Sequence, residues 1–270
     1  MTSVTQFFQQ SELALASYAK NLFPGISGDL YQTALEDGGQ GFAPSQAQQF
    51  ALTWRVLDQY TDSTGLSATI FEEVSSGKRT LAIRGTQAEA GDIVSDVLLA
   101  AGVSARLNPQ FDALQAKLDN EWLAEGGLLR GQPFTVSGHS LGGYLAAAVK
   151  AQYSAQVTSV YLYNAPGSGG LIGNIAGLVA GVFSQTVPGA DGVWNIKASE
   201  GASIIGGLGL QGSAAIPIQI EQAPGLSWCD LLAWEFDLEG TTQPAHKSRR
   251  WQDGAAASGT INDSAWRLAA

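Results

Sequence analysis

The N-terminal part of the chain places hydrophobic side chains at helical spacing. Over residues 6–21 the apolar positions suit one face of an amphipathic first helix. A loop broken by glycine and proline follows to about residue 43. Pro44 then starts a second predicted helix, which continues through Asp58 and carries a broad apolar surface.

The middle of the chain alternates strand and helix patterns. Two β-rich runs at 67–74 and 79–84 flank the polar residues 75–78 and predict a β-hairpin. Strands that alternate with helices predict a mostly parallel sheet covered by helices on both faces. Residues 1–270 are therefore predicted to form a single α/β domain. The further predicted elements are helices at 91–102, 110–125 and 144–151 and strands at 132–137, 157–163 and 193–197.

Residues 167–189 depart from this alternation, because they are apolar and rich in glycine. Their length approaches a membrane span, but the glycines and Asn174 make a span a poor interpretation. Two interpretations remain open. The segment is either a buried crossover helix or a lid that covers the site in water and opens on a lipid surface. Residues 203–220 have a similar composition, so 167–220 is the candidate lid region.

The sequence Gly138-His139-Ser140-Leu141-Gly142-Gly143 joins the strand predicted at 132–137 to the alanine-rich helix at 144–151. A G-x-S-x-G pattern in this context is typical of a nucleophile elbow. Its glycines allow a turn too tight for Cβ atoms, and the helix N-terminus favours negative charge that develops at the serine. We therefore predict that Ser140 is a catalytic nucleophile. The alternative is a glycine-rich turn with an incidental serine.

A serine nucleophile needs a base, and the chain contains two histidines, His139 and His246. Adjacent side chains on a sharp turn point apart, whereas a base must lie within hydrogen-bond distance of the nucleophile. His139 is therefore a poor candidate. His246 lies downstream among polar loop residues, in the order serine, acid, histidine that α/β-hydrolases use. It is the predicted base.

The oxyanion formed by attack on an ester needs hydrogen-bond donors. The backbone N–H of Leu141, directly after the nucleophile, is the first predicted donor. The second is Thr86, through its backbone N–H and its hydroxyl, because Arg84-Gly85-Thr86 ends an earlier predicted strand. An ordinary turn after a strand is the alternative interpretation of Thr86.

The acid of the triad is expected just past the strand at 193–197. Glu200 fits this position best. Asp191 precedes the strand and so falls at the other edge of the sheet, and Asp230 lies in an aromatic segment that suggests a helix. Glu200 is the predicted acid, with Asp230 and Asp191 as alternatives.

Several segments resemble the catalytic half of bacterial lipases exported by the type I route, within the lipase class 3 superfamily. Residues 81–86 (LAIRGT), 91–100 (GDIVSDVLLA) and 136–143 (VSGHSLGG) are similar to three successive motifs there. The segment 246–254 follows that group's pattern of histidine, aromatic residue and Asp-Gly. This resemblance covers roughly residues 65–255. It implies an α/β-hydrolase fold and carboxylesterase or lipase activity, with Ser140 as nucleophile and His246 as base.

The chain departs from this group in two respects. The acid there is usually an aspartate, whereas this chain has Glu200, which can fill the same orienting role. The calcium-binding glycine-rich repeats of the exported lipases are absent, so that export route loses support. Those lipases also bind calcium near their lids, and Asp92 and Asp96 could face one ion. A solvated helix face is the favoured interpretation of this pair, and no cofactor is expected to be required.

Composition and charge bear on the binding partners and the location of the protein. The net charge of −10 and pI of about 4.6 argue against attraction to nucleic acid through basic patches. Cys229 is the single cysteine of the sequence, which excludes an internal disulfide. The N-terminal residues have neither a basic region nor a long apolar stretch of a Sec signal. The expected location is therefore cytoplasmic, or outside the cell by a non-Sec route.

These features predict a serine carboxylic-ester hydrolase that cleaves fatty-acyl esters, with transient contact to a lipid interface. A phospholipase A or a polyester hydrolase would use the same triad. A catalytically silent hydrolase fold that binds an apolar ligand is the alternative from a different class. The intact elbow and the downstream His246 argue against that alternative.

Overall fold

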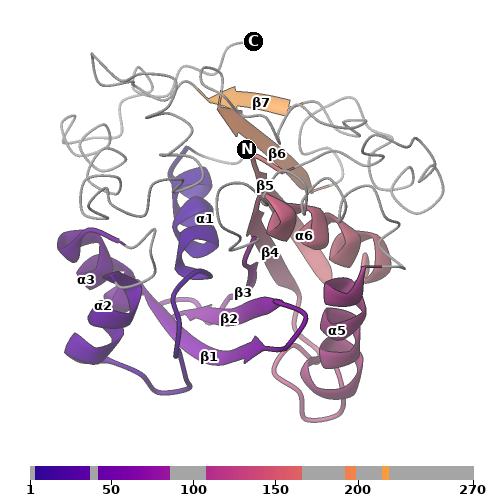
Figure 1. Cartoon of the computed structure of the whole chain (residues 1–270), viewed down its shortest axis with the longest axis horizontal. Helices are drawn as coiled ribbons and strands as arrows, with labels where there is room; N and C mark the ends of the chain where they lie inside the picture. The colour runs from indigo at the N-terminus through magenta and orange to yellow at the C-terminus, as the bar shows by residue number, and fades with distance from the viewer. Residues whose placement is uncertain (1–3, 37–41, 86–107, 166–191, 199–214, 219–270) are drawn as a thin grey trace.

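The computed structural model describes residues 4–36, 42–85, 108–165, 192–198 and 215–218 (Figure 1). These residues contain a seven-stranded sheet whose strands lie in chain order. The first three strands pair in antiparallel fashion, and β3 to β7 are parallel. The predicted α/β class is confirmed. The strands are β1 (Trp54–Thr61), β2 (Ser67–Glu73), β3 (Arg79–Ile83), β4 (Phe134–His139), β5 (Val157–Tyr163), β6 (Val193–Ala198) and β7 (Ala215–Ile218).

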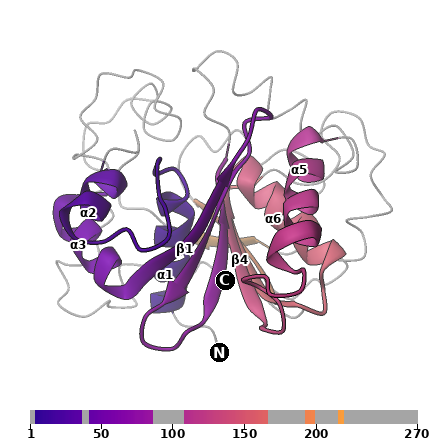
Figure 2. The same cartoon turned by 90° about the horizontal axis from the view of Figure 1, so that it is seen from below.

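Helices cover both faces of the sheet, as Figure 2 shows with the sheet between two helical layers. In one layer α1 packs on the central strands β3, β4 and β5. In the other layer α6 follows β4 directly and packs on β4 and β5. The first layer holds α1 (Val4–Ala16), α2 (Gly28–Glu36) and α3 (Pro44–Thr53), and the second holds α5 (Pro109–Lys117), the π-helical turn η2 (Leu118–Trp122) and α6 (Leu141–Gln152).

Alternate residues of the central strands supply the two cores. Val160 and Leu162 of β5 join the core beneath α5 and α6, whereas Tyr161 and Tyr163 pack with Phe7 of α1 on the opposite face. Tyr163 also donates its hydroxyl hydrogen bond to the Phe7 carbonyl. A sheet that buries both faces is typical of parallel α/β folds. It holds the central strands rigidly, which matters because the candidate nucleophile follows β4.

Two predicted elements in the N-terminal part were wrong. The helix predicted through Asp58 ends at Thr53, and Trp54 begins β1 with an extended backbone. Trp54 and Val56 are buried while Arg55 between them is exposed, so the strand alternation competes with the helical spacing. The predicted loop before Pro44 contains α2, which buries Tyr31 and Leu35 one helical turn apart.

Other boundaries also differ. The first helix ends at Ala16 rather than at residue 21, and Asn21 adopts a positive φ of 60°. The predicted hairpin is confirmed, because β2 pairs with β3 in antiparallel register. The helix predicted at 110–125 is α5 followed by η2. The strands predicted before the elbow and at 157–163 and 193–197 are confirmed as β4, β5 and β6.

Part of the candidate lid region belongs to the sheet. Residues 193–198 and 215–218 form β6 and β7, so the sheet rather than a lid takes these residues. Residues 167–189, on which the choice between lid and crossover helix depends, lie outside the described residues, as does the helix predicted at 91–102.

Candidate active site

The predicted elbow is present between β4 and α6. Ser140 adopts φ 53° and ψ −126°, a conformation that L-residues rarely adopt. Its N–H donates to the Tyr163 carbonyl at 2.9 Å, and its carbonyl accepts from the Gly143 N–H at 3.0 Å. Backbone hydrogen bonds on both sides therefore hold the serine in this strained geometry, as is common where strain is part of a mechanism.

The glycines of the motif are required by close backbone packing. A Cβ at Gly138 would lie 2.3 Å from the Gly142 carbonyl oxygen. A Cβ at Gly142 would lie 2.2 Å from the Ile83 carbonyl oxygen, and one at Gly143 would lie 2.6 Å from the Ala165 Cβ. Real Cβ atoms essentially never approach another atom this closely. The expectation that the turn is too tight for side chains at these positions is confirmed.

Leu141 is the first residue of α6 and is buried. The first four amides of a helix have no acceptor within the helix, and the helix dipole adds positive potential there. The position of Leu141 directly after Ser140 therefore suits a donor to an oxyanion, as the sequence predicted. This role of its N–H stays a prediction, since it depends on a bound substrate.

The end of β3 lies against the elbow. β3 and β4 are parallel neighbours, with Ile83 opposite Gly138. Beyond the strand, a Cβ built on Gly85 would lie 2.7 Å from the His139 carbonyl oxygen and 3.3 Å from the Ser140 Cβ. The chain therefore leads into Thr86 from a point beside the nucleophile. Thr86 itself lies outside the described residues.

His139 makes a contact that the sequence analysis missed. Its Nδ1 lies 3.0 Å from the hydroxyl oxygen of Tyr18, which follows α1. Burial lowers the pKa of the His139 imidazole to about 4. The ring is therefore neutral near pH 7, and its Nδ1 is occupied by Tyr18. No local pattern points to Tyr18, because its partner lies 121 residues away in the sequence.

The predicted base and acid lie outside the described residues. His246 belongs to the range 219–270, and Glu200, Asp191 and Asp230 also fall in ranges without described placement. The sheet still bears on the choice of acid. β6 is parallel to β5, and β5 to β4, so the carboxyl end of β6 lies at the same sheet edge as Ser140. Glu200 follows this end closely in sequence, whereas Asp191 precedes the opposite end.

The described residues were compared with the features expected of a metal site and of a membrane-spanning helix. They contain no group of three or more histidine, cysteine or acidic residues arranged to hold a metal ion. Asp92 and Asp96, the calcium candidates, lie outside them, as does Cys229. None of the described helices is long and apolar enough to cross a membrane.

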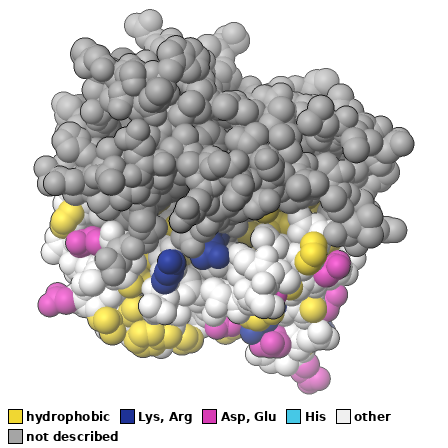
Figure 3. All heavy atoms as spheres, viewed as in Figure 1, with side chains coloured by type: hydrophobic (Ala, Val, Ile, Leu, Met, Phe, Trp, Pro, Cys, Tyr) yellow, Lys and Arg dark blue, Asp and Glu magenta, His cyan; other side chains and the backbone are white. Residues whose placement is uncertain are grey.

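Figure 3 shows one face of the molecule, on which hydrophobic side chains gather along the lower edge of the described part. The large hydrophobic side chains exposed among the described residues are Phe23, Leu30, Leu52 and Val74. They belong to the N-terminal helices, their loops and the hairpin turn, not to the elbow. These four side chains are therefore separate from the apolar lid surface that the sequence predicts over 167–189.

The sequence matches no protein-family model and has no significant match among curated proteins. Solved lipase structures are similar in fold. A fungal lipase–inhibitor complex has 16% identity and a TM-score of 0.53 over 87% of this chain and 95% of that one. A triacylglycerol lipase described as having a serine protease triad has 16% identity and a TM-score of 0.52 over 86% and 94%. The lipase of Rhizopus microsporus var. chinensis has 15% identity and a TM-score of 0.51 over 83% and 77%.

At this level of identity the likeness shows the fold. The chain has a lipase-like α/β-hydrolase fold, as the motifs predicted. None of these three structures is named as a bacterial exported lipase, so the narrower resemblance to that group stays a prediction.

Proposed function

We propose that this protein is a serine carboxylic-ester hydrolase of lipase or esterase type. The observation that carries the proposal is Ser140, held by backbone hydrogen bonds at φ 53° between a buried strand and a helix N-terminus. The lipase-like fold supports it, because the solved structures that share this fold are lipases by name. Fold alone does not imply function, so the argument depends on the site.

The proposed reaction has two steps. The Ser140 Oγ attacks the ester carbonyl carbon while His246 takes the hydroxyl proton, and the N–H groups of Leu141 and Thr86 stabilise the oxyanion. The intermediate collapses to an acyl-enzyme, and the alcohol leaves with the proton from His246. Water then attacks the acyl carbon, again giving its proton to His246, and the acid is released as Ser140 regains its proton. Glu200 orients the imidazole and stabilises its charged form.

A fatty-acyl ester is the favoured substrate class. The named lipases of similar fold and the apolar segment 167–189 both support a lipid-like substrate. In this proposal residues 167–189 form a lid that opens at a lipid interface. A phospholipase A or a polyester hydrolase would use the same residues. A silent fold is less favoured, because strain at a residue of no use would be lost readily to an unstrained turn.

The test compares the whole chain with its Ser140→Ala variant on a chromogenic short-chain ester. Wild type should turn the ester over, and the variant should lose at least about a thousandfold in kcat while unfolding at the same denaturant concentration. A serine-directed phosphonate should label wild type at Ser140. Labelling at another residue, or full activity of the variant, would contradict the mechanism. No turnover of any ester would favour the silent fold.

The same assay assigns the other members of the triad. His246→Ala should lose far more activity than His139→Ala, and Glu200→Gln far more than Asp230→Asn or Asp191→Asn. A chain-length series with and without detergent then separates a lipase from a short-chain esterase, because a lid gives a jump in rate when the substrate forms an interface.

A further inference from the structure

Tyr18 is a buried residue outside the nucleophile motif that contacts both sides of the candidate site. It lies two residues beyond the end of α1, and its side chain is almost fully enclosed. Its hydroxyl oxygen lies 3.0 Å from His139 Nδ1, next to the nucleophile. This hydroxyl also lies against Gly85, which follows β3. One oxygen atom therefore joins the carboxyl ends of β3 and β4.

Both partners of the Tyr18–His139 hydrogen bond are uncharged near pH 7. Burial raises the pKa of the Tyr18 hydroxyl, so it stays protonated, and burial lowers the pKa of His139 to about 4, so the imidazole stays neutral. The 3.0 Å hydrogen bond between the Tyr18 hydroxyl and His139 Nδ1 therefore joins two neutral groups, and which of them donates depends on the His139 tautomer.

The segment that carries Tyr18 is itself held rigidly. The side chain of Gln59 in β1 accepts the Leu22 N–H at 2.9 Å and donates to the Ala19 carbonyl at 2.8 Å. Ser17 donates its hydroxyl to the Ala14 carbonyl at 2.6 Å. These hydrogen bonds fix the backbone on both sides of Tyr18. Its hydroxyl has a fixed place in the fold, as a positioning group needs.

Gly85 needs such support because β3 ends before it. Arg84 still makes a backbone hydrogen bond, from its N–H to the Ser67 carbonyl at 2.9 Å. Gly85 lies instead against the Tyr18 hydroxyl. The fit is tight, since a Cβ at Gly85 would lie 2.5 Å from that oxygen. The next residue along the chain is Thr86, the predicted second donor to the oxyanion.

We propose that Tyr18 is a positioning residue of the candidate active site, whose hydroxyl holds Gly85 and His139 in place beside Ser140. The inference rests on the proposed ester hydrolysis. Loss of the hydroxyl leaves His139 Nδ1 without this partner and a gap beside Gly85, so the backbone that carries Ser140 and the Leu141 N–H is held less firmly. Donors misplaced by a fraction of an ångström stabilise the oxyanion poorly, while binding of the ester itself is little affected.

The test is Tyr18→Phe, with Tyr153→Phe as the matched control. Tyr153 is also buried and donates its hydroxyl to Asp119 at 2.8 Å, but it lies at the other end of α6 from Ser140. Tyr18→Phe should lower kcat by about tenfold to a hundredfold with KM within about twofold. The rate of Ser140 phosphonylation should fall in parallel, because the phosphoryl oxygen needs the same donors. Tyr153→Phe should lower stability and leave kcat unchanged.

The outcomes separate the two proposals. If wild type hydrolyses esters and Tyr18→Phe keeps its kcat and its phosphonylation rate, Tyr18 is only structural and the inference fails while the proposed function stands. A change in KM alone would also overturn it, since it would make Tyr18 a substrate contact. If wild type itself neither turns over esters nor reacts with the phosphonate, the proposed function fails and the inference fails with it.

Discussion

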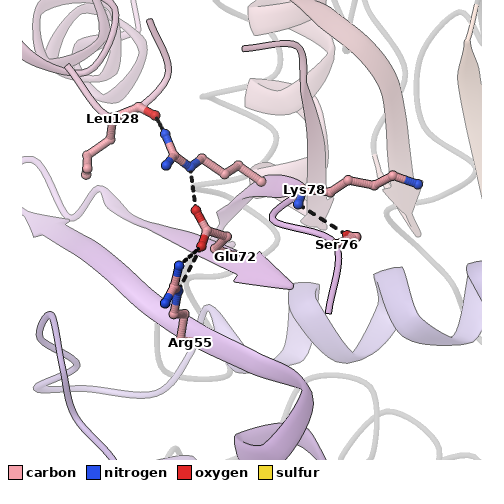
Figure 4. A network of polar contacts seen from close by, with 6 residues as sticks. Arg55, Glu72, Ser76, Lys78 and Leu128 are labelled. Carbon is pink, nitrogen blue, oxygen red and sulfur yellow. Dashed lines mark hydrogen bonds and ion pairs between the residues drawn. The ribbon is translucent and has the colours of Figure 1, made fainter. Parts of the chain in front are cut away.

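The two ends of strands β3 and β4 are built in different ways. At the carboxyl end, the backbone packs closely beside Ser140, with Gly138 leaving no room for a Cβ and Tyr18 bonded to His139. At the amino end, Glu72 of β2 accepts hydrogen bonds from two guanidinium groups, those of Arg55 and Arg79 (Figure 4). One end is held by backbone fit and the other by ion pairs.

The charged end keeps its carboxylate ionised. The side chain of Glu72 is 4% exposed, and that burial alone would raise its pKa. The hydrogen bonds and charges of Arg79 and Arg55 outweigh the burial, so the pKa lies below its ordinary value. Arg79 also donates to the Leu128 carbonyl and so connects the hairpin to the loop before β4. Long side chains of this kind can adjust to small shifts.

The carboxyl end lacks this tolerance. Several of its closest contacts involve backbone atoms, such as Gly142 against the Ile83 carbonyl, and these atoms cannot move independently of their strands and helix. We infer that changes at the charged end alter stability without altering the site, whereas changes at the elbow alter both. The predictions below test this division from the largest expected effect to the smallest.

Gly142→Ala should have the largest effect. The new Cβ would lie 2.2 Å from the Ile83 carbonyl oxygen, and neither the first turn of α6 nor the end of β3 can move alone. We expect the free energy of unfolding to fall by more than about 3 kcal/mol, with loss of ester turnover. Denaturant unfolding and the ester assay measure the two effects.

Gly126→Ala is the matched control for this change. Gly126 has a φ of 77° and nothing within 4 Å of an added Cβ, so its cost is the strained φ alone, about 1 kcal/mol. Its turnover should be normal. A Gly142→Ala variant as stable and as active as Gly126→Ala would show that the elbow tolerates side chains and would remove the contrast between the two ends.

The elbow could be predicted from the sequence because its signals are local. Gly138 and Gly142 flank Ser140 between an apolar run and an alanine-rich run, and each signal lies within a few residues of the others. The fold class followed from the same alternation of strands and helices. The geometry of Ser140 then confirmed the elbow without changing its residues.

What the sequence missed depends on contacts between distant segments. Residues 54–58 place apolar side chains at spacings that fit a helix as well as a strand, and pairing with β2 decides for the strand. Tyr18 carries no local signal of its contact with His139. Glu72, between Arg55 and Arg79, is placed by the register of three strands, which no single segment specifies.

Glu72→Gln should have an intermediate effect confined to stability. The amide keeps the shape but loses the charge, and one oxygen acceptor becomes a donor that faces a guanidinium group. We expect a loss of about 2 kcal/mol near pH 7 with kcat unchanged. Because the folded pKa is lowered, the stabilisation is present above the ordinary pKa and is lost as the pH falls below it. A clear loss of kcat would contradict the independence of the two ends.

Glu12→Gln should have the opposite sign and, near pH 5, the smallest effect. Burial raises the pKa of Glu12 to about 7, and its hydrogen-bond partner among the described residues is Gln46 Nε2 at 3.0 Å, not a cation. A folded pKa above the unfolded value of 4.5 means that wild type loses stability as the pH rises from 4.5 to about 7. The variant avoids this loss. It should match wild type near pH 4 and exceed it by about 1 kcal/mol near pH 5 in denaturant unfolding. Equal stability at both pH values, or a variant that is less stable at the higher one, would show that Glu12 is ionised at no cost. The opposite pH dependence expected for Glu12, beside a neutral amide, and Glu72, beside two guanidinium groups, would then not be explained by their hydrogen-bond partners.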